Sequence, residues 1–113
     1  MPITILELEG EVTKVLLSGR IDIVGAREIE MPMAVVAGSR RAVVVDLSAV
    51  EFMASLGLRG IVISAQSILR KKGKMVLLSP QPMVEEVITT TGVNTLVPIY
   101  HDEVAAIAAV TAD

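Results

Sequence analysis

The chain has 113 residues, the length of a single domain spanning residues 1–113, and 52% of them are hydrophobic whereas 20% are charged. This composition supports a packed core and excludes a disordered chain. The absence of cysteine excludes disulfides and thiolate sites, while a net charge of -3 and only two aromatic residues, Phe52 and Tyr100, argue against direct nucleic-acid binding.

The first half of the chain predicts a hairpin, a helix and a buried strand. Residues 3–19 read as two short alternating strands, and Gly10 supplies the turn between them. Residues 25–37 have helical character, although Pro32 removes a backbone donor and predicts a kink or a late start. The branched apolar run "RAVVVDL", residues 41–47, is typical of a strand buried on both faces.

The second half predicts three more helices and two more strands. Residues 57–73 form the longest predicted helix, with an apolar face made of Leu58, Ile61, Val62, Ala65, Ile68 and Leu69. Its last turn is basic, and Gly73 is expected to close it. The remaining elements are a strand over 74–79, a helix over 82–92, a short strand over 97–100 and a helix over 102–112.

The order of these elements predicts an α/β fold. Buried strands that alternate with helices favour a mixed, mostly parallel sheet of about five strands, with an antiparallel N-terminal hairpin and about four helices.

Motifs for catalysis, metal binding and cofactor binding are absent from the sequence. His101 is the single histidine, and without a co-ligand it is expected to be solvated or to cap the terminal helix. No dinucleotide fingerprint and no phosphate-binding loop occur. The basic segment "RKKGK", residues 70–74, is expected to interact favourably with the C-terminal end of the helix dipole and to keep the protein soluble. We therefore expect no enzyme activity, no metal and no cofactor.

The sequence also gives an expectation of location. No apolar run reaches the roughly 18 residues of a membrane-spanning helix, and the N-terminus lacks the basic start and cleavage site of a signal peptide. We expect a cytoplasmic protein without membrane insertion, whose oligomeric state stays open.

A strand, a turn and a helix meet at Ser55 within "VVVDLSAVEFMASLGLRGIV", residues 43–62. The turn is expected to cross the edge of the sheet and to bury Val50 and Phe52. Ser55 is expected at or beside the N-cap of the helix, where its oxygen can accept bonds from free backbone N–H groups. The same place tolerates a phosphate, because helix N-termini favour anions. A capping serine and a phosphorylated serine are both open at this point.

This segment closely resembles the signature of the STAS domain in anti-sigma-factor antagonists. The matching residues are Val43 to Val45, Asp46, Leu47, Ser48, Val50, Phe52, Met53, Ser55, Gly57 and Leu58. "LLSGRID", residues 16–22, resembles the family's strand ending in Gly-x-x-Asp, and residues 72–107 resemble its C-terminal half. The resemblance covers nearly the whole chain and implies a single STAS domain.

The resemblance implies a phosphorylation switch at Ser55. In that family the matching serine is phosphorylated by a serine kinase that is itself the anti-sigma factor, and a serine phosphatase reverses the reaction. The unphosphorylated antagonist binds the kinase and frees the sigma factor. The partner surface expected here, which includes an exposed stripe on the helix after Ser55, comprises Asp22, Ala54, Ser55, Leu56, Gly57, Arg59 and Ile63. Gly57 is expected to let another protein approach closely.

One position departs from the family pattern. The family usually has aspartate directly before the serine, whereas Ala54 stands there, which leaves Asp22 as the nearest acidic candidate. Leu56 is bulkier than the small residue that is usual in the family. Two functions therefore stay open. One is a phosphorylation-controlled antagonist, and the other is a non-phosphorylated STAS scaffold or subunit of a stress-signalling or lipid-transport complex.

Overall fold

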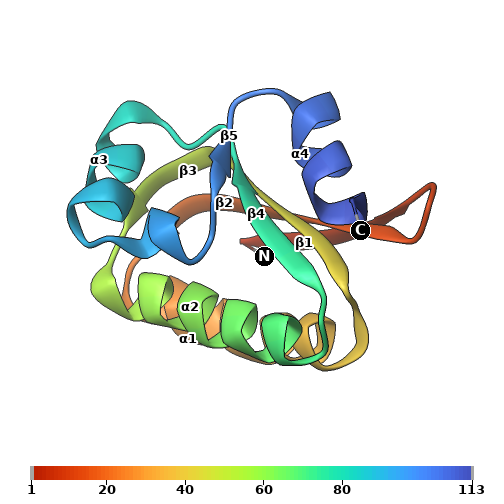
Figure 1. The fold of residues 1–113 in the computed structure, drawn as a ribbon. Helices are drawn as coiled ribbons and strands as arrows, with labels where there is room; N and C mark the ends of the chain where they lie inside the picture. Colours follow the sequence, from red (N-terminus) through yellow and green to blue (C-terminus); the bar gives the residue numbers. More distant parts are fainter. Residues whose placement is uncertain (1, 113) are drawn as a thin grey trace.

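The computed structural model describes residues 2–112, which form a five-stranded sheet flanked by helices (Figure 1). The strands are β1 (Ile3–Leu8), β2 (Val12–Ile21), β3 (Ala42–Met53), β4 (Lys74–Leu78) and β5 (Ile99–Tyr100). The helices are α1 (Ile23–Ser39), α2 (Ser55–Arg70), α3 (Pro82–Thr90) and α4 (Glu103–Thr111), with a 3-10 turn η1 (Val93–Thr95). This order confirms the α/β fold that the sequence predicts.

The sheet is mixed and mostly parallel. Its strand order is β1-β2-β3-β4-β5, with β1 antiparallel to β2 and every other neighbouring pair parallel. The hairpin turn contains Gly10 at φ 77, a left-handed conformation that glycine adopts without steric cost. Each parallel crossover carries a helix, so the chain returns to the same edge of the sheet before each new strand.

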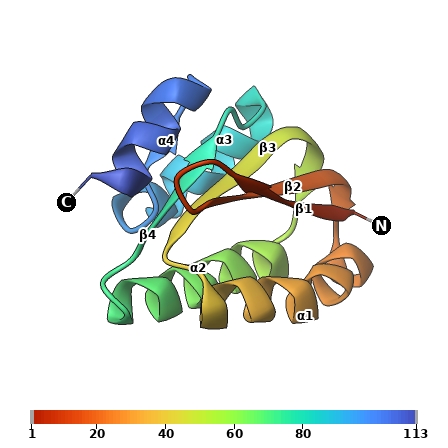
Figure 2. The same cartoon turned by 90° about the vertical axis from the view of Figure 1, so that its right-hand side faces the viewer.

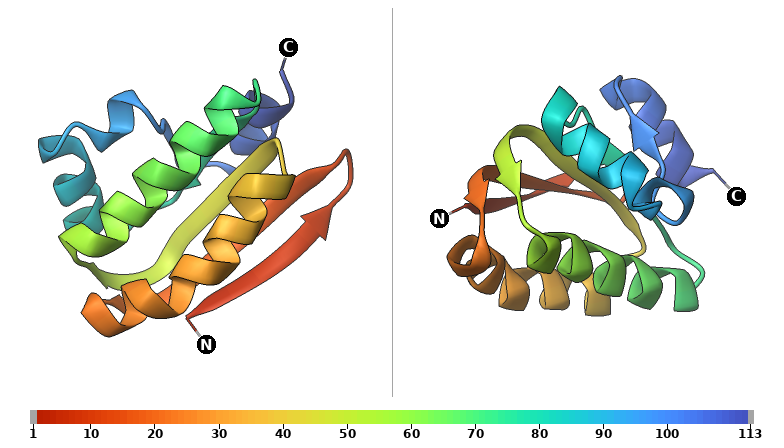
Figure 3. Two further views of the ribbon diagram at one scale, coloured as in Figure 1. Left: turned by 90° about the horizontal axis from the view of Figure 1, so that it is seen from below. Right: turned by 90° about the vertical axis from the view of Figure 1, so that its left-hand side faces the viewer.

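The helices cover the two faces of the sheet unequally. Helices α1 and α2 lie side by side on one face, and α4 lies on the other (Figures 2 and 3). The larger core joins α1 and α2 to residues of β2, β3 and β4, and its fully buried members include Leu17, Ile21, Val45, Leu47, Ile61, Ile68 and Leu77. The smaller core lies under α4 and contains Val12, Val44, Val76, Leu78, Ala106 and Val110.

The segment after Leu47 is a continuation of β3, so the predicted turn is wrong. Gly19 pairs with Val50 and Arg20 with Phe52, which leaves Glu51 as an extra residue, a β-bulge. The bulge reverses the alternation of side chains. Val50, which precedes the bulge, is fully buried as expected, whereas Phe52, which follows it, is 39% exposed.

The ends of α1 and α2 also differ from the prediction. Helix α1 begins at Ile23 and continues through Pro32, so the late start is wrong, and its 17 residues make it longer than the 16-residue α2. On α2, Leu69 is 44% exposed, so the core face is narrower than predicted. After α2, Lys72 adopts φ 65, and Gly73 is required because a Cβ there would lie 2.4 Å from the Arg41 carbonyl oxygen.

Candidate partner-binding site

Two helix N-termini lie next to each other at one edge of the sheet. Strands β2 and β3 are parallel and end together, with Ile21 opposite Met53. The backbone N–H of Ala54 donates to the Ile21 carbonyl oxygen at 2.8 Å, which ties the entry of α2 to the entry of α1. The first N–H groups of each helix have no intrahelical acceptor and carry partial positive charge. This edge therefore suits an anion or an acidic partner.

Asp22 is the N-cap of α1. Its Oδ1 accepts a hydrogen bond from the Gly25 backbone N–H at 2.9 Å, and the side chain is half-buried. The turn is tight, because a Cβ on Gly25 would lie 2.6 Å from the Arg20 carbonyl oxygen. Asp22 thus lies directly between β2 and α1, and its carboxylate is used within α1.

Ser55 is the first residue of α2, and the N-cap is Ala54, which has no side chain that can cap. The Ser55 side chain is exposed, and among residues 2–112 no hydrogen bond to its hydroxyl is found. The capping interpretation of Ser55 is therefore wrong. Its hydroxyl faces solvent at a helix N-terminus, where a phosphate would meet free N–H donors.

The predicted stripe on α2 is exposed. Leu56 is 41% exposed, Ile63 is 52% exposed, and Arg59 is also exposed. Gly57 is different, because it is buried and a Cβ there would lie 2.7 Å from Met53 Sδ and 2.8 Å from Ile21 Cγ2. The absence of a side chain at Gly57 therefore serves packing against the sheet, which differs from the reason given by the sequence.

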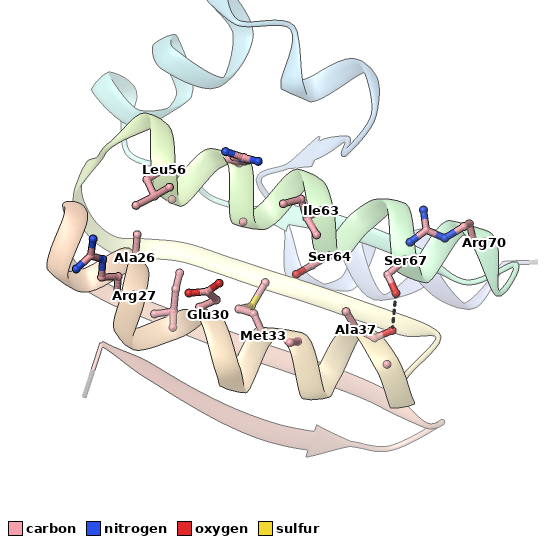
Figure 4. Close-up of a pocket in the computed structure, with 16 residues that line it drawn as sticks. Ala26, Arg27, Glu30, Met33, Ala37, Leu56, Ile63, Ser64, Ser67 and Arg70 are labelled. Atoms are coloured by element: carbon pink, nitrogen blue, oxygen red, sulfur yellow. Dashed lines mark hydrogen bonds between the residues drawn. The ribbon is translucent and has the colours of Figure 1, made fainter.

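A groove of about 650 Å³ runs between α1 and α2 (Figure 4). Leu56 lies at one end of it with Arg27, and Arg70 lies at the other. Its apolar and small lining residues are Ala26, Ile29, Met33, Ala34, Ala37, Gly38, Leu56, Gly57, Gly60 and Ile63. The stripe predicted on α2 forms one side of this groove, whereas the α1 side was not predicted, because the pairing of two helices is a tertiary contact.

A second exposed feature lies at the end of β2 and β3. The Arg20 guanidinium carbon lies 4.4 Å from the centroid of the Phe52 ring, a cation–π contact between paired residues of the two strands. Phe52 was expected in the core, so this contact could not be inferred from the sequence.

Two ionisable groups away from Ser55, His101 and Lys14, have structural partners. His101 Nε2 lies 3.2 Å from Glu85 Oε1 in an exposed pair. The Lys14 ammonium donates to Glu103 and lies 3.6 Å from Asp46 Oδ2, and these contacts, the hydrogen bond to Glu103 first, raise the pKa of Lys14. Since Glu103 is on α4 and Lys14 on β2, this pair holds α4 on the sheet.

Between residues 2 and 112, no cluster of three or more potential metal ligands occurs. Within the same residues, each helix is too short or too polar to cross a bilayer.

Comparison with known proteins identifies the family. Residues 4–106 match the STAS domain family. BtrV of Bordetella bronchiseptica, described as an anti-sigma factor antagonist, is 33% identical over 95 residues, which are 82% of this chain and 81% of BtrV. The crystal structure of an anti-sigma factor antagonist from Mycobacterium paratuberculosis is 36% identical, with a TM-score of 0.82 over 96% of this chain and 93% of that chain.

A more distant match shows the fold alone. SpoIIAA of Bacillus is 18% identical and has been solved unphosphorylated, with a TM-score of 0.76 over 91% of each chain. Its phosphorylated form gives a TM-score of 0.72 over 91% of this chain and 95% of that chain. With the fold, the exposed serine and these relatives together, the chain belongs to the STAS domain family of anti-sigma factor antagonists.

Proposed function

We propose that this protein is a non-enzymatic switch in partner-switching control of transcription. Unphosphorylated, it binds an anti-sigma factor that is also a serine kinase, and the sigma factor is released. The kinase transfers the γ-phosphoryl group of ATP to the Ser55 hydroxyl, the complex dissociates, and a serine phosphatase restores the hydroxyl. These reactions take place in the cytoplasm. The observation that carries the proposal is the exposed Ser55 hydroxyl, which has no hydrogen-bond partner among residues 2–112.

The surroundings of Ser55 support a switch that acts on an interface. Leu56 and Ile63 are exposed apolar side chains on the same side of α2, and Arg59 lies between them in sequence. Aromatic, methionine and arginine side chains are enriched at interfaces, and the Arg20–Phe52 pair lies at the adjacent strand ends. A phosphate adds about two negative charges at pH 7, which suffices to disrupt an interface of modest size through repulsion and desolvation.

The test uses the serine kinase encoded nearest to this gene. Incubation with ATP should add one phosphate, detected by intact-mass spectrometry, and Ser55→Ala should abolish it. Ser48→Ala is a matched control, because Ser48 is also an exposed serine at the sheet edge. Phosphate on Thr89 or Thr91 instead would contradict the assignment of Ser55.

Partner binding is tested with the same proteins. Ser55→Asp should weaken the kinase complex, and Leu56→Ala or Arg59→Ala should weaken it by about 1–2 kcal/mol with little change in melting temperature. Isothermal titration calorimetry measures the affinity of each variant for the kinase, and melting curves measure its melting temperature. Full affinity in both alanine variants would place the interface elsewhere, such as the end of β2 before Asp22 or α4.

A scaffold without phosphorylation is the second candidate, and Ala54 favours it. The residue before Ser55 offers no carboxylate, and the nearby carboxylate of Asp22 is bonded to the Gly25 N–H. A scaffold would bind its partner stably, and Ser55→Asp would leave the affinity unchanged.

A further inference from the structure

Three arginines around the α1–α2 groove have no acidic partner in the described chain. Arg27, Arg59 and Arg70 line the groove, and none of their guanidinium groups forms an ion pair or hydrogen bond with another residue between 2 and 112. Glu30 is the only carboxylate in the lining. The groove therefore has an excess of two positive charges in a protein whose net charge is -3.

The shape of the groove suits an elongated occupant. Its α1 side extends from Ala26 to Gly38, and a rise of 1.5 Å per residue gives a length of roughly 18 Å, about three turns of a docked helix. The floor is apolar, with Met33 between the helices and Ile63 on the α2 side (Figure 4). A helix with apolar side chains at three- and four-residue steps would match such a floor.

The apolar surface continues past the rim on the α1 side. Val24, Met31 and Val35 are 66%, 73% and 61% exposed, and their spacing of seven and four residues places them on one ridge of α1. The opposite side of the same helix is in the core, through Ile29 and Val36. A surface that covers both groove and ridge fits a protein partner better than a small ligand, which would leave the ridge in water.

We propose that the α1–α2 groove binds an amphipathic helix of the anti-sigma factor, whose acidic side chains pair with Arg27, Arg59 and Arg70. This inference rests on the proposed function and specifies which part of the partner binds and with which charge. Leu56 and Gly57 line the groove directly after Ser55, so the groove is continuous with the phosphorylation site. A phosphate on Ser55 would repel the acidic helix and compete with it for arginine, which explains why a small modification releases it.

The first test uses two synthetic peptides as probes. Both are fluorescein-labelled 14-residue helices with leucine on one face, and the flanks carry glutamate in one and lysine in the other. Fluorescence anisotropy should show the glutamate peptide binding at least about tenfold tighter than the lysine peptide. NMR shifts of the backbone amides should cluster on α1 and α2. Equal binding of the two peptides, or shifts centred on α4, would overturn the proposal.

Matched variants locate the charge effect. Arg70→Glu, at the end of the groove far from Leu56, should weaken the glutamate peptide about tenfold, whereas Arg41→Glu should leave it within about twofold. Arg41 is an exposed arginine outside the groove, so both variants change the net charge equally. Ile63→Glu is a second groove variant in case Arg70→Glu fails to fold by circular dichroism. It replaces an apolar side chain at a half-exposed position of the groove by a negative charge and should also weaken binding of the glutamate peptide.

The outcomes separate this inference from the proposed function. If the kinase phosphorylates Ser55 but binds Arg70→Glu and Ile63→Glu with full affinity, the groove proposal fails while the function stands. If no kinase modifies Ser55 but the glutamate peptide still binds in the groove, the function fails and the groove chemistry stands. Binding to phosphatidylglycerol vesicles that Arg70→Glu abolishes, with no binding of the glutamate peptide, would make the groove a lipid-binding surface and overturn the helix proposal.

Discussion

Two glycines three residues apart on α2 allow the packing of this helix to be measured directly. Alanine at Gly57 would place its Cβ 2.7 Å from Met53 Sδ and 2.8 Å from Ile21 Cγ2, whereas alanine at Gly60 would meet no atom within 4 Å. Met53 can move its flexible end, but Ile21 is branched and fully buried. Overpacking of this kind costs about 1–3 kcal/mol, and each glycine-to-alanine change in a helix gains about 1 kcal/mol.

The comparison of the two variants isolates packing, because the helix-propensity gain is common to both. Gly60→Ala should raise the free energy of unfolding by about 1 kcal/mol, and Gly57→Ala should lie about 1–3 kcal/mol below it. With a urea m-value of about 1–3 kcal/mol per M, the midpoints should differ by about 0.3–3 M. Urea titrations followed by circular dichroism measure this. Equal stabilisation by both variants would refute the packing role of Gly57. It would favour the original expectation that Gly57 lets a partner protein approach closely.

Substitutions at three further positions test the helix ends and the α4 contact. Ala54→Asp adds an acceptor at the N-cap of α2 and should raise stability by about 1 kcal/mol while changing the rate of Ser55 phosphorylation; an unchanged melting temperature would contradict the N-cap assignment. Asp22→Ala removes the acceptor of the Gly25 N–H and should lower stability by about 1 kcal/mol in melting curves, whereas Asp22→Asn should retain most of it. The pKa of Lys14 is raised above 10.5, so the stabilisation that charged Lys14 contributes is complete below that pH and is lost as the pH rises through the pKa of the folded protein. The free energy of unfolding of Lys14→Met should therefore approach that of the wild type in urea titrations at alkaline pH. A difference that stays constant with pH would contradict this.

The parts of the fold that the sequence predicts correctly are those in which one pattern has one physical solution. The run Val43 to Val45 is branched and apolar at every position, and only a strand covered on both faces satisfies it. Gly10 and Gly92 both adopt positive φ at the ends of predicted elements. The helix predicted over residues 102–112 is found as α4, and its N-cap Asp102 accepts a hydrogen bond from the Ala105 N–H.

The parts that the sequence misses depend on a neighbouring element. Phe52 is exposed because a register shift against β2 creates the bulge at Glu51, and nothing within residues 48–53 contains that information. The assignment of Ser55 or Ala54 as the N-cap differs by a single residue, which lies within the ordinary error of helix boundaries. The α1–α2 groove requires two helices to be packed together before its arginines can be seen as one group.

The two N-caps at this edge show why a phosphate would act on the surface and leave the fold intact. At α1 the Asp22 carboxylate already accepts the Gly25 N–H, so that N-terminus is internally satisfied. At α2 the cap is Ala54, and the positive end of the helix is open beside the Ser55 hydroxyl. An anion there would gain about 0.3–1 kcal/mol from the helix dipole, which is too little to rearrange a domain and has a stabilising sign. The two negative charges of the phosphate would also repel an acidic partner in the adjoining groove, and no change elsewhere in the chain offsets this repulsion. In the proposed switch, the energy of phosphorylation would therefore act almost entirely on the complex with the partner, as a reversible exchange of partners requires.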